Sequence, residues 1–311
     1  MNNEEKKMIA VVGPTASGKT ALSICLAKHF DGEIISADSM QIYKGMTVAT
    51  AKPTAQEMCG IRHHIMDFLD PRESFSVSEF VDMAFCAAED IFSRGKLPIL
   101  CGGTGLYVRS FLENIKFTDE KTDPALREEL QKRYINEGGE ALIEELRGFD
   151  PETADRLLPS NSKRIIRAIE IYRLTGITMS EFIKSSKQTP FPYSFTAIGI
   201  TYADRQKLYD RINRRVDIML ENGLIEEAKE FYSSDIGMTA SAAIGYKELK
   251  PYLDGAISLD EAAENLKAAT RHYAKRQLTW FRKDSYINWI EADRTDNVAE
   301  EAIKIIDRKD V

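Results

Sequence analysis

Cysteine is scarce in this 311-residue chain, and its spacing shows no metal-binding or disulfide pattern. The four cysteines, Cys25, Cys59, Cys86 and Cys101, include no Cys-x-x-Cys pair. The sequence therefore favours reduced thiols and argues against a zinc site or a disulfide framework. Long apolar runs are also missing, and the first residues lack the apolar segment of a secretory signal. We expect a cytoplasmic protein with no membrane partner.

Positive charge is slightly under-represented. The chain has 42 Lys and Arg against 49 Asp and Glu, a formal net charge of −7. This balance argues weakly against nonspecific nucleic-acid binding, but it leaves room for a local basic surface. The hydrophobic content of 43% and the charged content of 29% are those of an ordinary globular protein. The length allows one large domain or two modest ones.

The most informative segment follows the apolar run Met8–Val12. It fits the phosphate-loop pattern G-x-x-x-x-G-K-[ST] without mismatch, between an expected strand and an expected helix. Its residues are Gly13, Pro14, Thr15, Ala16, Ser17, Gly18, Lys19 and Thr20. Backbone N–H groups of such a loop and the helix N-terminus bind phosphate, Lys19 adds a positive charge, and Thr20 can ligate Mg²⁺. The segment predicts binding of a diphosphate or triphosphate.

Short β-rich runs alternate with helical patterns, which is typical of a parallel α/β sheet. The expected strands are 7–12, 33–37, 63–66, 97–101, 195–201 and 286–290. Between 118 and 194 the β-rich runs disappear, and helix starts such as Asp123-Pro124 take their place. We predict a P-loop NTPase-like parallel sheet flanked by helices, with an inserted all-helical domain. The core would be 1–117 and 195–311, with long helices starting near Asp204 and Ser258, and the insertion would be 118–194.

An ordinary ATPase would place an Asp after a second apolar strand, to hold Mg²⁺. The best candidate strand is instead followed by Gly102-Gly103-Thr104-Gly105, where glycines allow a bulky group to approach the backbone. The carboxylate comes after the strand at 33–37, as Asp38. There it could bind Mg²⁺, orient a hydroxyl, accept a proton, or simply cap a turn.

Basic residues cluster in three places despite the acidic total. The helix from Ser258 to Lys283 carries an apolar stripe of Ala262, Leu266, Ala269, Tyr273 and Trp280. Near its other side lie Lys267, Arg271, Lys275 and Arg282, with Arg276 at the border. The other two clusters are 205–215 and 163–167. These clusters predict contacts to a phosphate backbone, although each could also be a solvated face with ordinary ion pairs.

Seven separated motifs together resemble the tRNA dimethylallyltransferase family, also called the tRNA isopentenyltransferases. They are Gly-Pro-Thr-Ala-Ser-Gly-Lys-Thr at 13–20, Asp-Ser-Met-Gln-Ile-Tyr at 38–43, Thr-Ala-Lys-Pro at 50–53, Gly-Gly-Thr-Gly-Leu-Tyr at 102–107, Lys-Arg-Ile-Ile-Arg-Ala-Ile-Glu at 163–170, Ile-Gly-Tyr-Lys-Glu at 244–248 and Lys-Arg-Gln-Leu-Thr-Trp-Phe-Arg at 275–282. The resemblance extends over nearly the whole chain. The chain ends without the zinc-finger tail of many members from outside bacteria, so we expect the compact bacterial form.

The resemblance implies transfer of a dimethylallyl group from dimethylallyl diphosphate to N6 of adenosine 37 of a tRNA, next to the anticodon. Residues 13–20 would hold the diphosphate with Mg²⁺, and Asp38 would take the N6 proton as general base. Lys19 would stabilise charge on the departing diphosphate. Thr104 and Arg109 would face the transferred group. The adenine would have to be flipped out of the anticodon loop.

The same resemblance implies a set of tRNA contacts, with the insertion closing over the anticodon stem-loop. These residues are Asp38, Ser39, Met40, Gln41, Thr104, Arg127, Lys163, Arg164, Gly245, Tyr246, Lys247, Lys275, Arg276 and Gln277. Lys163 departs from the family pattern, in which Gln is common. We see no assembly motif and expect a monomer.

Three alternatives stay open at this point. A phosphate-loop kinase would use Asp38 to orient a substrate hydroxyl, but it would not need the long basic helices. An adenylate isopentenyltransferase would perform the same chemistry on a free nucleotide, which needs neither those helices nor the insertion. A noncatalytic RNA-binding protein would not need an intact Lys19, Thr20 and Asp38.

Overall fold

The computed structural model of the chain describes residues 6–115, 123–186, 189–233, 237 and 240–309. The chain forms two compact units. The first combines Met1–Phe111 with Pro192–Val311, and the second is Leu112–Phe191. The first unit contains the sheet and the phosphate loop, whereas the described residues of the second unit are helical or irregular.

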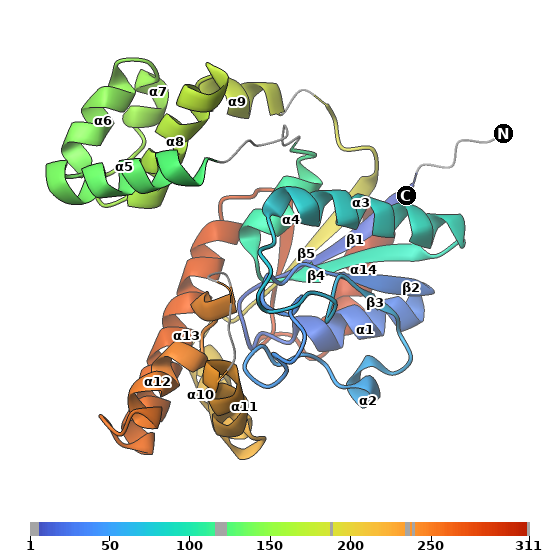
Figure 1. Ribbon diagram of the computed structural model, residues 1–311. Coiled ribbons are helices and arrows are strands. Elements are labelled where there is room, and N and C mark those ends of the chain that lie inside the picture. The colour runs from blue at the N-terminus through green and yellow to red at the C-terminus, as the bar shows by residue number, and fades with distance from the viewer. Residues whose placement is uncertain (1–5, 116–122, 187–188, 234–236, 238–239, 310–311) are drawn as a thin grey trace. The chain divides into compact units, whose positions relative to one another are not determined.

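Six strands form one sheet in the first unit (Figure 1). They are β1 (Lys7–Val12), β2 (Gly32–Ser36), β3 (His63–His64), β4 (Leu97–Gly102), β5 (Ser194–Thr201) and β6 (Ile287–Glu291), in the order β3-β2-β4-β1-β5-β6. All neighbouring pairs are parallel, which confirms the predicted parallel α/β sheet. β1 has the expected bounds, and the ends of the other strands differ from the expected ones by at most two residues. β3 ends early because Ile65 has a φ of 57°, outside the extended region.

The strand order brings three segments to one edge of the sheet. β1 lies between β4 and β5, and β4 also pairs with β2. The register aligns Val12 with Gly102 and Ser36 with Cys101. The phosphate loop after β1, Asp38 after β2 and Thr104 after β4 therefore meet at the carboxyl ends of adjacent strands, where open α/β sheets bind ligands.

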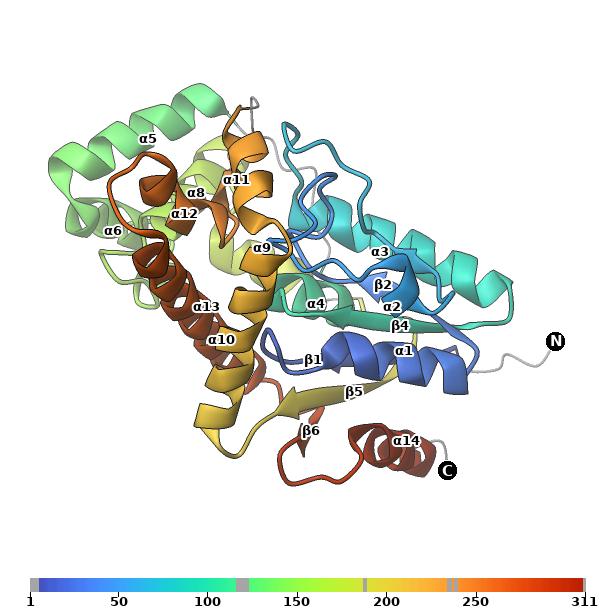
Figure 2. The same ribbon diagram turned by 90° about the horizontal axis from the view of Figure 1, so that it is seen from below.

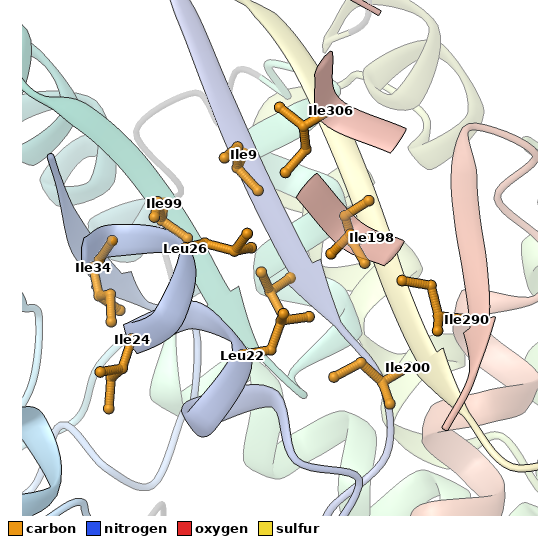
Figure 3. Close-up of a cluster of buried hydrophobic side chains, with 13 residues drawn as sticks. Ile9, Leu22, Ile24, Leu26, Ile34, Ile99, Ile198, Ile200, Ile290 and Ile306 are labelled. Carbon is orange, nitrogen blue, oxygen red and sulfur yellow. The ribbon is translucent and has the colours of Figure 1, made fainter. Parts of the chain in front are cut away.

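Helices cover both faces of the sheet (Figure 1). α1 (Lys19–His29) and α14 (Val298–Lys309) lie on one face, and α3 (Val77–Ser93) and α4 (Gly105–Leu112) lie on the other. Figure 3 shows Leu22 and Leu26 of α1 packed among isoleucines of the strands, with Ile306 of α14 nearby. This apolar contact fixes α1 behind the phosphate loop.

The first unit contains six further helices among its described residues. They are α2 (Ala55–Met58), α10 (Arg205–Glu221), α11 (Leu224–Ser233), the short 3₁₀ helix η1 (Ala240–Ala242), α12 (Tyr246–Leu253) and α13 (Leu259–Phe281). α10 and α13 begin where expected, and Asp204 and Ser258 cap them by accepting backbone N–H bonds. α10 ends before Gly223, whose φ is 92°. Figure 2 shows α10 and α13 side by side.

The second unit contains five helices among its described residues. They are α5 (Pro124–Glu137), α6 (Gly139–Arg147), α7 (Pro151–Ala154), α8 (Ser162–Thr175) and α9 (Met179–Ser186). Asp123 and Asp150 cap α5 and α7, each followed by proline at the first helical position. Leu130, Leu146 and Ile169 are fully buried in the small core between these helices. In neither unit is a described helix both long and apolar enough to cross a bilayer.

Candidate active site

The phosphate loop has backbone conformations that explain its glycines. Gly13 has a φ of 146°, and a Cβ there would lie 2.6 Å from the carbonyl oxygen of Ile200. Gly18 has a φ of 100° and is the N-cap of α1, so the positive end of that helix points into the loop. The Lys19 ammonium donates a hydrogen bond to the carbonyl oxygen of Pro14, at 2.7 Å. This bond holds the lysine across the loop, where it can exchange the carbonyl for a phosphate oxygen.

A cavity of about 990 Å³ opens above this loop; we name it the phosphate cavity. Residues 16–20 form one wall, and residues 47–54 contribute to another. The third wall is α10, through Arg211, Arg214 and Arg215. Arg211 is anchored by a 2.9 Å hydrogen bond from its Nε to the carbonyl oxygen of Ala16. Three guanidinium groups and Lys19 around one cavity fit a diphosphate.

Three arginines of α10 come from a basic cluster of the sequence. The cluster 205–215 predicts contacts with an RNA backbone, which stays a prediction, and the structure places three of its arginines around the phosphate cavity. The sequence does indicate that Arg211, Arg214 and Arg215 share one helix face, because they are spaced three and four residues apart. It could not indicate that this face turns toward the phosphate loop.

Burial lowers the pKa of Lys19 to about 8, with a further lowering effect of Arg215 and opposing effects of Cys101 and Asp38. Protonated Lys19 attracts a diphosphate, so donor affinity should fall as pH rises through 8. At pH 9 only about a tenth of the lysine is protonated, and the KM for the diphosphate donor should be about tenfold higher than at pH 7. Initial rates at pH 7–9.5 would test this. A flat KM would contradict the role of Lys19, provided that the KM for the acceptor stays constant.

Asp38 follows β2, and its carboxylate has two different environments. Oδ1 accepts hydrogen bonds from the N–H groups of Met40 (2.9 Å) and Gln41 (3.4 Å). In the described part of the chain no group hydrogen-bonds to Oδ2. Both interpretations of Asp38 from the sequence are therefore compatible: one oxygen caps the turn, and the other remains available for a substrate.

Asp38 lines a second cavity of about 240 Å³, which we name the Asp38 cavity. Arg215 and Met219 line both this cavity and the phosphate cavity, so the two adjoin. The other residues of the Asp38 cavity are Thr15, Ser39, Met40, Ala49, Thr50, Val216, Leu224, Ala243, Ile244, Gly245, Lys247, Leu266, Thr270, Tyr273 and Arg276. A group held in one cavity can thus meet a group held in the other, next to a free carboxylate oxygen.

Tyr273 is a site residue that the sequence analysis missed. Its place in the apolar stripe of α13 suggested a core side chain, yet it lines the Asp38 cavity. Burial and the Asp38 charge raise its pKa, so the phenol stays protonated and can donate a hydrogen bond. The spacing of Thr270, Tyr273 and Arg276, each three residues apart, is the signal that places all three on one face.

Thr104 ties two loops together. Its Oγ1 accepts a hydrogen bond from the Ser39 N–H at 3.0 Å, and its own N–H donates to the carbonyl oxygen of Ala37 at 3.2 Å. Neither cavity has Thr104 in its lining. The geometry therefore places Thr104 behind Ser39, as a support for the residue next to Asp38. Its expected contacts with RNA and with the transferred group remain predictions.

Gln277 is 5% exposed and its amide is used inside the protein, while its expected contact with RNA stays a prediction. The Thr15 N–H donates to Oε1 at 2.8 Å, and Nε2 donates to the Gly103 carbonyl oxygen at 2.9 Å. Gln277 thereby joins the phosphate loop to the loop after β4. A Cβ on Gly103 would lie 2.2 Å from Nε2, and one on Gly105 would lie 2.2 Å from Trp280. The bulky groups for which these glycines make room come from α13.

Replacing Gln277 with Ala should lower the free energy of unfolding by about 1–3 kcal/mol, because a part-buried N–H and a buried carbonyl lose their partner. The exposed neighbour Lys275 provides a matched control: Lys275→Ala should leave stability unchanged. Denaturant unfolding of both variants tests the prediction. Equal stability of Gln277→Ala and the wild-type protein would show that the bridge contributes nothing.

Other predicted residues divide into buried and exposed groups. Tyr246 is fully buried, and its hydroxyl donates to Glu227 at 2.8 Å. Arg109 pairs with Asp284 and lies 5.0 Å from the centre of the Trp280 ring, and neither cavity includes it. The expected RNA contact of Tyr246 and the expected position of Arg109 at the transferred group stay predictions. Gly245 lines the Asp38 cavity with a φ of 122°. Lys247 and Arg276 are exposed at its rim.

The basic face of α13 is partly used within the protein. Lys267 contacts Asp217 of α10 at 2.9 Å, and Arg271 donates to Asn213 at 2.6 Å. These two residues therefore hold α13 to α10. Gln41, another predicted RNA contact, donates from Nε2 to the carbonyl oxygen of Thr50 at 3.2 Å and does not line the Asp38 cavity.

Within the second unit, Lys163 and Arg164 are exposed on the first turn of α8. Arg127 of α5 contacts the fully buried Glu170 at 2.7 Å, and half of its side chain stays exposed. These three cations are available to a polyanion, although Arg127 also neutralises a buried carboxylate. Their expected contact with RNA stays a prediction.

Thr20 lies at the phosphate cavity with an exposed side chain. Among the described residues no three His, Cys, Asp or Glu side chains gather into a metal site. A single hydroxyl oxygen fits Mg²⁺ of the kind that takes most of its ligands from substrate phosphates and water. The donor set is thus compatible with a magnesium diphosphate, and unsuited to a metal held by protein ligands alone.

A phosphate loop at the carboxyl edge of a parallel sheet, next to a cavity with a free carboxylate oxygen, defines a P-loop protein that holds a phosphorylated donor beside an acceptor. Family models refine this class: the IPP transferase model matches residues 41–284, and the isopentenyl transferase model matches residues 6–73. The chain belongs to the IPP transferase family, and it is accordingly a prenyltransferase.

Individual relatives agree with this membership. The tRNA dimethylallyltransferases of Halalkalibacterium halodurans and Bacillus subtilis are each 48% identical to this chain over 94% of its length, covering 93% and 92% of their own. The crystal structure of the tRNA isopentenylpyrophosphate transferase from Bacillus halodurans matches with 46% identity and a TM-score of 0.70, covering 97% of this chain and 94% of that one. A eukaryotic dimethylallyltransferase acting on tRNA matches with 31% identity and a TM-score of 0.79, covering 96% and 78%.

Proposed function

We propose that this protein transfers the dimethylallyl group of dimethylallyl diphosphate to N6 of adenosine 37 of tRNA, beside the anticodon. The adjoining phosphate and Asp38 cavities, which share Arg215 and Met219, are the observation that supports this assignment best. In the reaction a bond forms between N6 and the allylic carbon, the carbon–oxygen bond to the diphosphate breaks, and N6 loses a proton. Diphosphate is the second product.

The donor would bind with its diphosphate in the phosphate cavity. Lys19, the loop N–H groups and the three arginines of α10 would hold the diphosphate and stabilise the charge that grows on it as it departs. The Thr20 hydroxyl would ligate Mg²⁺ together with the diphosphate oxygens. When bound, Mg²⁺ supplies further neutralisation of the departing group. The dimethylallyl carbons would then lie toward Met219, at the junction of the cavities.

The acceptor adenine would be flipped out of the anticodon loop into the Asp38 cavity. The free Oδ2 of Asp38 would accept the N6 proton, while Oδ1 stays on the turn N–H groups of Met40 and Gln41. This division keeps the carboxylate oriented during the reaction. The protonated Tyr273 phenol offers the base a hydrogen bond within the same cavity. Ser39 and Met40 would form the wall beside the base.

The anticodon stem-loop would be held by exposed cations, through its phosphates. In the first unit these are Lys247, Lys275 and Arg276, and in the second unit Arg127, Lys163 and Arg164. An RNA with its target base in the Asp38 cavity would pass Lys247 and Arg276, which stand at that cavity. An adenylate acceptor would need none of the cations outside the cavity, so their number favours RNA.

Radiolabelled dimethylallyl diphosphate, mixed with unmodified tRNA and in parallel with AMP, tests this proposal. Label on the tRNA adenosine would support it. Label on AMP alone would assign the protein to enzymes that act on free nucleotides. Incubation with ATP and nucleosides provides a third arm: phosphate transfer there, without transfer of label to tRNA, would indicate a kinase and overturn the proposal.

A further inference from the structure

The loop of residues 47–52 is a wall shared by both cavities. Its second half is held by the buried Lys52, which pairs with Asp67. Thr47, Val48, Ala51 and Lys52 line the phosphate cavity, and the two residues between them, at 49 and 50, line the Asp38 cavity. Any movement of this loop would therefore change the shape of the donor site and of the acceptor site together.

The carboxylate of Glu227, which lies outside the loop, forms hydrogen bonds with the first half of the loop. Glu227, in the first turns of α11, accepts N–H hydrogen bonds from three successive loop residues: Thr47 at 2.8 Å, Val48 at 2.7 Å and Ala49 at 2.9 Å. A fourth bond comes from the hydroxyl of the buried Tyr246, at 2.8 Å. Four bonds occupy the full acceptor capacity of a carboxylate, and bonds to a charged group are the stronger kind.

These contacts connect the loop to the elements that complete the two cavities. Glu227 belongs to α11, the helix that follows α10 and its three arginines of the phosphate cavity. Tyr246 opens α12 directly after Gly245, which lines the Asp38 cavity. The three loop N–H groups point to Glu227 and are therefore not available to a substrate. The loop presents its side chains and carbonyl oxygens to the cavities instead. Glu227 thus fixes which face of the loop the substrates meet.

We propose that Glu227 is a positioning residue, whose hydrogen bonds hold the loop 47–52 in place as the common wall of the donor and acceptor cavities. The expected change in kinetics rests on the proposed prenyl transfer. The position of the loop can be measured in the protein without substrates. Glu227 touches no substrate; it acts through the loop. Its removal should weaken binding of both substrates, whereas a defect in the phosphate loop should weaken binding of the donor alone.

The test compares Glu227→Gln with Glu226→Gln, the exposed neighbour on the same turn. The amide introduced by Glu227→Gln would present two N–H donors where the loop also presents donors, so the bonds cannot all re-form. We expect kcat/KM to fall by up to about 100-fold in Glu227→Gln, with higher KM values for both substrates. Amide hydrogen exchange in peptides covering residues 43–54 should become faster. Glu226→Gln should match the wild-type protein in both measurements.

Tyr246→Phe keeps the proposal testable if Glu227→Gln does not fold. It removes one of the four bonds and should shift exchange and both KM values in the same direction, by a smaller factor. Unchanged exchange at 43–54 together with unchanged KM values in either folded variant would overturn the inference. A variant whose only change is a lower melting temperature would overturn it as well. If the wild-type protein transfers no prenyl group, the proposed function fails. Exchange at 43–54 and the affinity for inorganic diphosphate then decide the inference.

Discussion

Asp38→Asn should reduce the rate of prenyl transfer by about 10²–10⁴-fold while both substrates still bind. Asparagine keeps an oxygen that can accept the N–H bonds from Met40 and Gln41, so the turn after β2 should persist. What it loses is the basic oxygen that faces the Asp38 cavity. Single-turnover rates, together with tRNA binding measured by filter retention, would separate the chemical step from binding.

Asp31→Asn is the matched control, because it makes the same chemical change at the other end of β2, where the Asp31 side chain is 81% exposed. It should react at the wild-type rate. Two results would contradict the assignment of Asp38 as base: wild-type turnover in Asp38→Asn, or a loss of tRNA binding that accounts for the whole defect. Asp38→Ala is the poorer test, since it would also remove the cap of the turn.

The sequence predicts the sheet and the phosphate loop well because both depend on local patterns. Apolar β-rich runs specify the strands, and the glycines at 13 and 18 specify backbone conformations that other residues avoid. Asp38 was predictable for the same reason: it directly follows a buried strand at the edge where parallel sheets bind ligands. These inferences need only the chain near each residue.

The orientation of the C-terminal helices was not predictable in this way. Gln277 and Arg276 are neighbours in a basic segment of α13, yet one is buried against two loops and the other is exposed at a cavity. Their roles depend on which loop lies opposite each helix face, and that contact joins distant parts of the chain, such as Thr15 and Gln277 with a separation of 262. Helical periodicity gives the face but not its partner.

The arginines of α10 show the same limit of prediction from sequence, because the sequence does not indicate which polyanion they face. A cluster of positive charge in the sequence fits any polyanion, and RNA and diphosphate present the same phosphate chemistry. Only the packing of α10 against α13, through Leu208, Ile212 and Ala274, directs Arg211, Arg214 and Arg215 toward the phosphate loop. The placement of these arginines at the phosphate cavity is thus a property of the fold.

Lys19→Ala should lower kcat/KM for dimethylallyl diphosphate by about 10²–10³-fold, the usual effect of removing a group that stabilises charge in the transition state. The tRNA affinity should stay unchanged, because the lysine lies at the phosphate cavity and does not line the Asp38 cavity. Lys28→Ala, an exposed lysine in the last turn of the same helix α1, is the matched control and should react normally. Loss of tRNA affinity in Lys19→Ala would contradict the separation of the two sites.

Thermal unfolding provides a second test, because Lys19→Ala should lower activity without lowering the melting temperature of the protein. Burial lowers the pKa of Lys19 from 10.5 to about 8, so carrying its charge costs the folded protein stability at pH 7. That cost decreases as pH rises from 8 toward 10.5. Without ligand, Lys19→Ala should therefore unfold at the same temperature as the wild-type protein or at a higher one. Inorganic diphosphate should raise the melting temperature of the wild-type protein, and should raise that of the variant far less. A variant that is less stable without ligand, yet equally stabilised by diphosphate, would show that Lys19 supports the loop and does not bind the donor.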